Sequence, residues 1–193
     1  MQQLKSLTDQ ELISLYLNNH PTAFETLLKR HRDKVYTSIY LFVKDTETAE
    51  DIFQEVFIKI IDTLRKGKYK NEDKFQQWAM RIAYNLCVDH FRKSKKMSFI
   101  AGTESFSPFD IIGDNEGNME QSIIKSEIHT RLRKLIDQLP DEQREVVILR
   151  NYADMSFKEI AQMTNVSINT SLGRMRYALI NLRKLMTEAE MVA

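Results

Sequence analysis

Hydrogen-bonding and cationic side chains gather near the C-terminus of this chain, at a spacing suited to binding an anionic partner. Arg174 and Arg176 carry planar guanidinium groups that can bind a guanine edge or a phosphate, and Asn169 can reach a base edge or the backbone. Ser167, just before them, is a good N-cap, so we expect one helix to hold all three. Asn165 tolerates left-handed backbone, which suits a tight turn ahead of that helix. The chemistry predicted here is recognition through charge and hydrogen bonds.

A second helix is predicted immediately upstream of this turn. Ser156 and Glu159 stand three residues apart, which is the spacing of a capping box that starts a helix. Two short helices joined by a tight turn, with cations on the second, are typical of a helix-turn-helix, which lays its second helix in the major groove of DNA. An ordinary helical bundle with solvated arginines is the alternative. The predicted buried stripe of the second helix consists of Ile168, Leu172, Met175, Leu179, Leu182 and Met186.

The most regular amphipathic pattern lies between residues 47 and 64. Asp45 is the predicted cap of this helix and Gly67 its predicted end. An apolar stripe follows helical spacing on one face and an acidic stripe follows it on the opposite face, so one face should be buried. The apolar stripe consists of Ala49, Ile52, Phe53, Val56, Phe57, Ile60, Ile61 and Leu64. The acidic stripe consists of Glu47, Glu50, Asp51, Gln54 and Glu55.

The rest of the chain also has helical periodicity, with one interruption. Apolar spacing predicts further helices that start at or near Thr8, Pro21, Phe75, Met119 and Pro140. The helix from Phe75 should end near Lys93. Between 97 and 118 the periodicity disappears, glycines and a proline break the chain, and every charge is acidic.

The predicted fold is all-α, with two helical domains. The first domain covers 1–96, a flexible acidic linker covers 97–122, and the second domain covers 123–193 and contains the helix-turn-helix. Hydrophobic residues make up 42% of the 193 residues and charged residues 28%, which indicates a globular protein. Only 5 Gly and 3 Pro are present, too few for a turn-rich sandwich or barrel.

The net charge of +1 hides an uneven distribution along the chain. Residues 1–96 have 17 Lys and Arg against 13 Asp and Glu, a balance of +4. Residues 97–124 have no cation against 5 carboxylates, and residues 125–193 have 11 cations against 9 carboxylates, a balance of +2. Two basic segments on either side of an acidic one favour a nucleic-acid partner.

The sequence also indicates a compartment and excludes several classes of function. Cys87 is the only cysteine, which excludes an internal disulfide and fits a reducing compartment. Residues 1–11 lack the apolar core of a signal peptide, and the apolar run 39–43 is too short to span a bilayer, so we expect a soluble cytoplasmic protein. The four histidines are not at metal-ligand spacing, and neither a Gly-rich phosphate loop nor a nucleophile elbow is present. We therefore expect no metal, no cofactor, no small-molecule substrate and no catalytic residue.

Two sets of motifs stand in the two halves of the chain. The first set consists of Ala49-Glu50-Asp51, Gln54-Glu55-Val56-Phe57, Phe75-x-x-Trp78, Arg81-Ile82-Ala83-x-Asn85, Asp89 and Phe91-Arg92. The second set consists of Leu139-Pro140, Arg144-x-Val146, Leu149-Arg150 and the stretch from Ser156 to Arg174. These motifs resemble regions 2 and 4 of the extracytoplasmic-function (ECF) sigma factors, which belong to the sigma-70 family of promoter-specificity subunits of bacterial RNA polymerase. The resemblance covers roughly 24–95 and 125–186.

The resemblance implies a mechanism for both halves. A sigma subunit binds core RNA polymerase and directs transcription initiation at promoters with −10 and −35 elements. The acidic helix would dock on a coiled coil of the polymerase, the first domain would bind the melted −10 strand, and the C-terminal helix would bind duplex −35 DNA. Factors of this type commonly have an anti-sigma partner, often anchored in the membrane, and we expect one here. The alternative function is a helix-turn-helix regulator that binds an operator and has an N-terminal sensor bundle.

The resemblance also assigns three sets of site residues. The core-polymerase set is Glu50, Asp51, Gln54 and Glu55. The −10 set is Lys68, Tyr69, Lys70, Asn71, Phe75, Trp78, Arg81, Asn85, Arg92 and Lys93. The −35 set is Asn169, Thr170, Ser171, Gly173, Arg174, Arg176 and Tyr177.

The segment before Arg174 departs from the common family pattern. Many members have an apolar residue, a basic residue and a serine there, whereas this chain has Ser171, Leu172 and Gly173. The missing cation removes one expected contact with DNA. The missing side chain at Gly173 leads to the hypothesis that the helix approaches DNA more closely.

Overall fold

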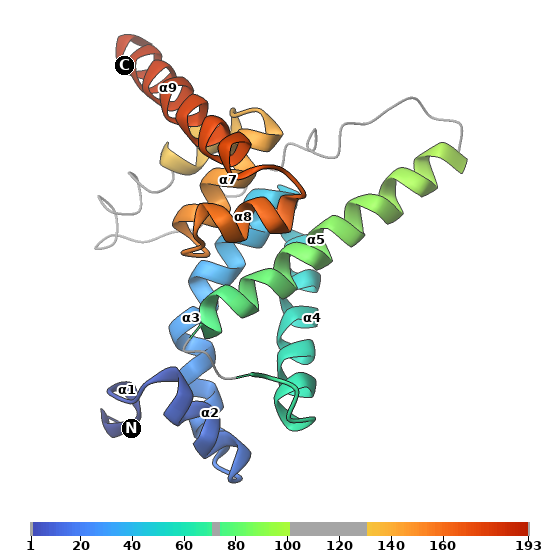
Figure 1. Cartoon of the computed structure of the whole chain (residues 1–193), viewed down its shortest axis with the longest axis vertical. Helices are drawn as coiled ribbons and strands as arrows, with labels where there is room; N and C mark the ends of the chain where they lie inside the picture. The colour runs from blue at the N-terminus through green and yellow to red at the C-terminus, as the bar shows by residue number, and fades with distance from the viewer. Residues whose placement is uncertain (1, 71–73, 101–130, 193) are drawn as a thin grey trace. The chain divides into compact units, whose positions relative to one another are not determined.

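The computed structural model describes residues 2–70, 74–100 and 131–192, and every regular element in these ranges is a helix (Figure 1). The chain divides into two compact units, Met1–Pro108 and Phe109–Ala193. The prediction of an all-α protein is confirmed, while the domain boundaries stay a prediction. Most of the predicted linker, the predicted helix start near 119 and Asn71 lie outside the described residues.

Local sequence explains where the helices of the first unit begin. These helices are α1 (Gln2–Lys5), α2 (Asp9–Leu17), α3 (Pro21–Val43), α4 (Thr46–Arg65) and α5 (Phe75–Ile100). Thr8 and Glu11 form a reciprocal capping box at the start of α2, and Pro21 occupies the first turn of α3, where its missing N–H is not needed. The Asp45 side chain accepts the Thr48 N–H at 2.8 Å, so α4 begins where the sequence predicts.

The core of the first unit lies between its three long helices. α3, α4 and α5 pack on one another, and α2 packs on α3 and α4 (Figure 1). The predicted apolar stripe of α4 faces this core, with Phe53 and Ile61 half-buried and the other six residues buried. Each buried aliphatic side chain contributes about 1.5–3 kcal/mol relative to exposure. The stripe therefore holds the acidic stripe of α4 in solvent.

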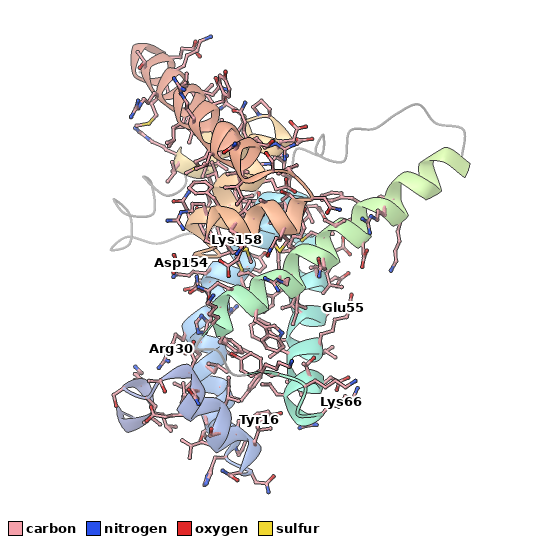
Figure 2. All side chains as sticks on the ribbon, viewed as in Figure 1. Tyr16, Arg30, Glu55, Lys66, Asp154 and Lys158 are labelled. Atoms are coloured by element: carbon pink, nitrogen blue, oxygen red, sulfur yellow. The ribbon has the colours of Figure 1, made fainter. Side chains whose placement is uncertain are left out.

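Asp9 joins the N-terminal helices to α3. Its Oδ1 accepts a hydrogen bond from Arg30 Nη1 at 2.6 Å, and its Oδ2 lies 2.7 Å from His31 Nε2. Arg30, labelled in Figure 2, also donates from Nη2 to the carbonyl oxygens of Lys5 and Leu7, at 3.1 and 2.8 Å. One guanidinium thus contacts both the end of α1 and the first turn of α2, which fixes this helical pair on α3.

The second unit contains a helix over residues 131–137, α7 (Asp141–Asn151), α8 (Phe157–Thr164) and α9 (Ile168–Val192). α9 packs on both α7 and α8, and the α7 core residues include Val146, Ile148 and Leu149. Arg144 is 2% exposed, and its guanidinium donates to the Leu139 carbonyl at 3.1 Å and to Asp141 Oδ1 at 2.7 Å. These bonds compensate for the burial of a charge at the start of α7.

The end of α5 differs from the sequence prediction. The helix was expected to stop near Lys93, and the linker to begin at Met97, but α5 continues to Ile100. Residues 94–100 contain neither glycine nor proline, so nothing in the local sequence breaks the helix before Gly102. Helical backbone persists there without the apolar periodicity on which the prediction depended.

The predicted buried stripe of α9 is wrong. Four of its members are 44–47% exposed, namely Ile168, Leu172, Leu179 and Met186. Ser171 and Ala178 are completely buried instead, one helical heptad apart. Small side chains let α9 lie close against α7 and α8, whereas the long apolar side chains turn outward. Packing between helices, which is not a local property of α9, decides this rotation.

Candidate nucleic-acid interface

The helix-turn-helix forms as the local sequence predicts. Ser156 Oγ accepts the Glu159 N–H at 3.3 Å, and Glu159 Oε2 accepts the Ser156 N–H at 2.9 Å, which completes a capping box. α8 ends at Thr164, and its C-cap Asn165 has a φ of 59°, which lies in the left-handed region. Ser167 Oγ accepts the Thr170 N–H at 3.0 Å and caps α9. α8, the turn and the first turns of α9 are therefore fixed by local hydrogen bonds.

The −35 set separates into exposed and buried members. Asn169, Thr170, Arg176 and Tyr177 are exposed, and Tyr177 reaches 61%. Ser171 is completely buried, so its predicted contact with DNA is corrected: the side chain faces the core on which α9 packs. The other two members, Gly173 and Arg174, are partly exposed and have distinct surroundings.

Arg174 lies in an ion-pair network inside the unit. Its guanidinium is 24% exposed and lies 3.9 Å from a carboxylate oxygen of Glu142 and 3.7 Å from one of Glu145, both on α7. Glu145 is itself only 23% exposed, so this pair is better shielded from water than a surface pair. The sequence placed Arg174 among DNA contacts because a lone arginine on a polar face gives no sign of carboxylates from another helix.

Gly173 is the only member of the set without a side chain. A Cβ built on Gly173 would meet no atom within 4 Å, so packing inside the described protein does not require glycine there. Glycine in a helix interior costs roughly 0.5–1 kcal/mol relative to alanine. Gly173 thus has room for a side chain, and lacking one costs stability. Both observations favour an external partner that approaches the helix closely at this position.

Aromatic residues of the −10 set form one cluster in the first unit. The ring centroid of Tyr69 lies 4.5 Å from that of Trp78, and Phe75 lies 6.2 Å from Tyr69 and 5.7 Å from Trp78. Phe75 is 2% exposed, so its assignment as a DNA contact is corrected: it is a core residue that supports the other two rings. Tyr69 and Trp78 are half-buried, so part of each ring reaches the surface.

The polar members of the −10 set lie at the surface. Lys68 and Lys70 precede α5, and both are exposed. On α5 itself the exposed members are Arg81, Asn85, Arg92 and Lys93. Arg92 Nη1 lies 3.5 Å from Asp89 Oδ1, an ion pair one helical turn apart. Cations around partly exposed rings are the usual arrangement for binding single-stranded nucleic acid.

The acidic face of α4, defined by Glu50, Asp51, Gln54 and Glu55, is exposed at all four positions. Glu55, labelled in Figure 2, is 3.1 Å from Lys59 Nζ on the next turn. Partial burial raises the pKa of Tyr36 on α3, and the nearby Glu50 carboxylate raises it further. The face is thus a concentrated negative surface supported by a fully apolar opposite side.

Sequence reasoning missed Ile58, which is 60% exposed on this same face. It stands four residues after Gln54 and three after Glu55, and it does not belong to the buried stripe. An apolar residue outside the stripe of so regular a helix was the available signal. Exposed apolar anchors surrounded by polar residues are typical of the centre of a protein interface.

Three further features concern the residues that the structure describes. No three His, Cys, Asp or Glu side chains within them are grouped so that they could hold a metal ion. None of the described helices combines the length and apolar character needed to span a membrane. Cys87 is 1% exposed, and burial raises the pKa of its thiol to about 12, so the nucleophilic thiolate is suppressed at neutral pH.

Comparison with known proteins gives the same two regions. Residues 27–97 match the Sigma-70 region 2 family, and residues 129–174 match the Sigma-70, region 4 family. The chain is 30% identical over 166 residues to the ECF RNA polymerase sigma factor SigW of Bacillus subtilis, covering 84% of this chain and 88% of that protein. It is 27% identical over 170 residues to the RNA polymerase sigma-H factor of Pseudomonas aeruginosa, covering 86% and 87% of the two chains.

A solved structure extends the likeness to the fold. The sigma factor RpoE from Bartonella quintana, in complex with the anti-sigma factor NepR, has a TM-score of 0.63 with this chain at 18% identity. The match covers 85% of this chain and 96% of that one. With both sigma regions present in order, and SigW matched over most of its length, the chain belongs to the ECF sigma factors of the sigma-70 family, the promoter-specificity subunits of bacterial RNA polymerase.

Proposed function

We propose that this sigma factor uses three separate surfaces: the acidic face of α4 for core polymerase, the α5 surface for the −10 strand, and the first turns of α9 for the −35 duplex. The observation that carries the proposal is the contrast between two exposed faces. α4 presents carboxylates, whereas α9 has no Asp or Glu before Glu188. One face suits a basic protein surface and the other suits a polyanion.

The polymerase surface consists of the acidic face of α4 with Ile58 on it. Its carboxylates form charge-assisted hydrogen bonds with arginines of the polymerase. Ile58 inserts between them as an apolar anchor and excludes water from those bonds. The charged rim provides attraction over distance, and the anchor provides most of the affinity.

The −10 surface consists of the polar members of that set around Tyr69 and Trp78. The exposed cations of this surface hold phosphates. They are Lys68, Lys70 and the cations of α5, which stand before and after Tyr69 and Trp78 in the sequence. The partly exposed rings of Tyr69 and Trp78 stack on unpaired bases. Phe75 acts beneath them as support.

The −35 surface consists of the exposed members of that set, Asn169, Thr170, Arg176 and Tyr177, with Gly173 between them. Arg176 and Asn169 bind base edges or phosphates in the major groove. Arg174 acts indirectly, because its ion pairs with Glu142 and Glu145 hold α9 at a fixed angle on α7.

A protein that covers these surfaces would control the factor. The RpoE structure contains the anti-sigma factor NepR, and we propose an anti-sigma partner for this chain as well. The sigma factor itself works in the cytoplasm, where bacterial polymerase and promoter DNA are found, and performs no catalysis of its own. The polymerase carries out the chemistry that this subunit directs.

The test is run-off transcription by purified core polymerase on sheared genomic DNA, with and without this protein, followed by mapping of RNA 5′ ends. New, discrete start sites that share −35 and −10 elements are expected. The double variant Asp51→Lys with Glu55→Lys should abolish them by weakening core binding at least tenfold, because two attractions become repulsions. Glu25→Lys, a charge reversal at an exposed position on α3, serves as the control and should transcribe normally.

Two results would contradict the proposal in different ways. Absence of new start sites together with tight binding to duplex DNA alone would favour an operator-binding regulator. Normal transcription by the double variant would remove the acidic face of α4 from polymerase binding while leaving the sigma function in place.

A further inference from the structure

An exposed leucine stands in the part of α9 that faces DNA in our proposal. Leu172 is 44% exposed, although its apolar character and spacing predicted a buried position. It lies in the second turn of the helix, between the capped N-terminus and Arg176. Among the described residues of the second unit, packing therefore does not account for a leucine at this position.

The neighbours of Leu172 are polar and exposed. Asn169 precedes it by three residues and Arg176 follows it by four, so all three side chains lie on one face of the helix. Gly173, the next residue, has no side chain, and apart from its two chain neighbours and the helix backbone a Cβ there would meet no atom within 4 Å. Leu172 thus projects from between an amide and a guanidinium, with an empty position next to it.

The surrounding charge identifies the kind of partner. No carboxylate occurs in α9 before Glu188, and Arg176 and Arg183 are exposed cations on it, whereas Arg174 is paired with Glu142 and Glu145 of α7. The N-terminus of the helix adds a partial positive charge of its own. A partner that fits this surface is a polyanion that also offers an apolar group at the depth of the leucine. The major groove of DNA has one such group, the C5-methyl of thymine.

We propose that Leu172 recognises a thymine methyl group in the −35 element and so selects a T·A pair at one position. The inference rests on the proposed function, because it assumes that α9 enters the −35 major groove. Asn169 and Arg176 fix the helix in the groove through hydrogen bonds, and Leu172 contacts the methyl group between them. The absence of a side chain at Gly173 lets the helix approach closely enough for this contact.

Deoxyuridine provides the test, because it pairs as thymine does and lacks only the C5-methyl. Each thymine of the mapped −35 element, on either strand, is replaced singly by deoxyuridine, and holoenzyme binding is measured by competition against the unmodified promoter. One position should lose about fourfold in affinity with the wild-type factor, the size expected for one methyl group removed from an apolar contact. With Leu172→Ala, the same replacement should have no effect.

Leu179→Ala is the matched control variant. Leu179 is also 44% exposed, belongs to the same helix and lies one heptad further on, about 10 Å along the axis. This variant should keep the full sensitivity to deoxyuridine, since the first turns of such a helix contact base edges. An unchanged helical circular dichroism signal and an unchanged midpoint of urea denaturation in both variants show that each is folded.

The possible results separate failure of the thymine contact of Leu172 from failure of the proposed −35 role of α9. Specific use of the −35 element without sensitivity at any thymine overturns the role of Leu172 and leaves the proposed function intact. Sensitivity that persists in Leu172→Ala also overturns it, because another side chain then contacts the methyl group. Loss of all dependence on −35 sequence, by contrast, overturns the proposed role of α9 itself.

Discussion

Two arginines that are two positions apart on α9 have different surroundings. Arg174 is held by Glu142 and Glu145, whereas Arg176 is exposed. We expect Arg174→Ala to lower the free energy of unfolding by about 0.5–1 kcal/mol, because it removes a partly shielded ion-pair network. It should weaken −35 binding by a similar factor on every sequence, since it changes the seating of α9. Urea denaturation and holoenzyme competition on a set of −35 variants measure both effects.

Arg176→Ala is the paired variant for this comparison. It should leave the free energy of unfolding unchanged and cost about 1–3 kcal/mol of binding at one base pair, if its guanidinium contacts a guanine edge. A stable Arg174→Ala protein with relaxed selectivity at a single position would instead show that Arg174 reaches the DNA directly.

At the residue scale, the sequence predicted chemical type better than it predicted orientation. Cationic and amide residues on α9 were identified because hydrogen-bonding groups can be recognised from residue type alone. The ion pairs of Arg174 are made with α7, which is more than twenty residues away in the chain, and the burial of Ser171 depends on the helices on which α9 packs. Phe75 was assigned to DNA for a similar reason: an aromatic residue can serve equally in a core or in a stack.

At the scale of elements, the contact of Asp9 with α3 is a polar tie that adds to the apolar packing of α2 on the first unit. Partial burial raises the pKa of this carboxyl, but hydrogen bonds and charge from His31 and Arg30 outweigh burial and hold it below the ordinary value of 3.8. A lowered pKa means that the folded protein stabilises the ionised carboxylate of Asp9 more than its protonated form. The stabilisation is therefore complete above the ordinary pKa and disappears as the pH falls through the lowered one.

We expect Asp9→Asn to lower the free energy of unfolding by about 1–3 kcal/mol at neutral pH, because it removes a charged acceptor from two partners. The difference from the wild type should shrink as the pH falls below 3.8. Denaturant titrations at several pH values test this, with Asp33→Asn, at an exposed position on α3, as the control. A difference that is constant down to the lowest pH would mean that the carboxylate charge is not what stabilises α2.

Helix starts were the most predictable elements, for a physical reason. The capping boxes at Thr8 and Ser156 and the cap at Asp45 each complete their hydrogen bonds within three residues, so the local sequence contains all the partners. The rotation of α9 about its axis has no such local determinant. It follows from the close approach that Ser171 and Ala178 allow, which depends on the shapes of two other helices.

At the scale of the whole molecule, two compact units share one chain and bind parts of the same assembly in our proposal. Linkage makes the second binding event intramolecular and raises its effective concentration. We expect cleavage at a protease site inserted near residue 115 to reduce transcription from a promoter with both elements about 100-fold or more. The helical circular dichroism signal should not change, because each unit has its own core.

The uncleaved insertion variant is the control for this experiment and should transcribe as the wild type does. Undiminished transcription after complete cleavage would show that the two units act without being covalently joined. In that case the −35 surface would contribute through contacts with polymerase that hold it in place.

Because Cys87 is buried, we expect the folded chain to be unreactive toward thiol reagents. At 1% exposure and with a thiol pKa of about 12, it should not react with a maleimide while the protein is folded. Two cysteines introduced at exposed positions, one on α4 and one on α9, can therefore take a donor and an acceptor dye without any change to the native cysteine. Energy transfer between the dyes then follows the separation of the two units as the factor moves from solution to polymerase and on to a promoter.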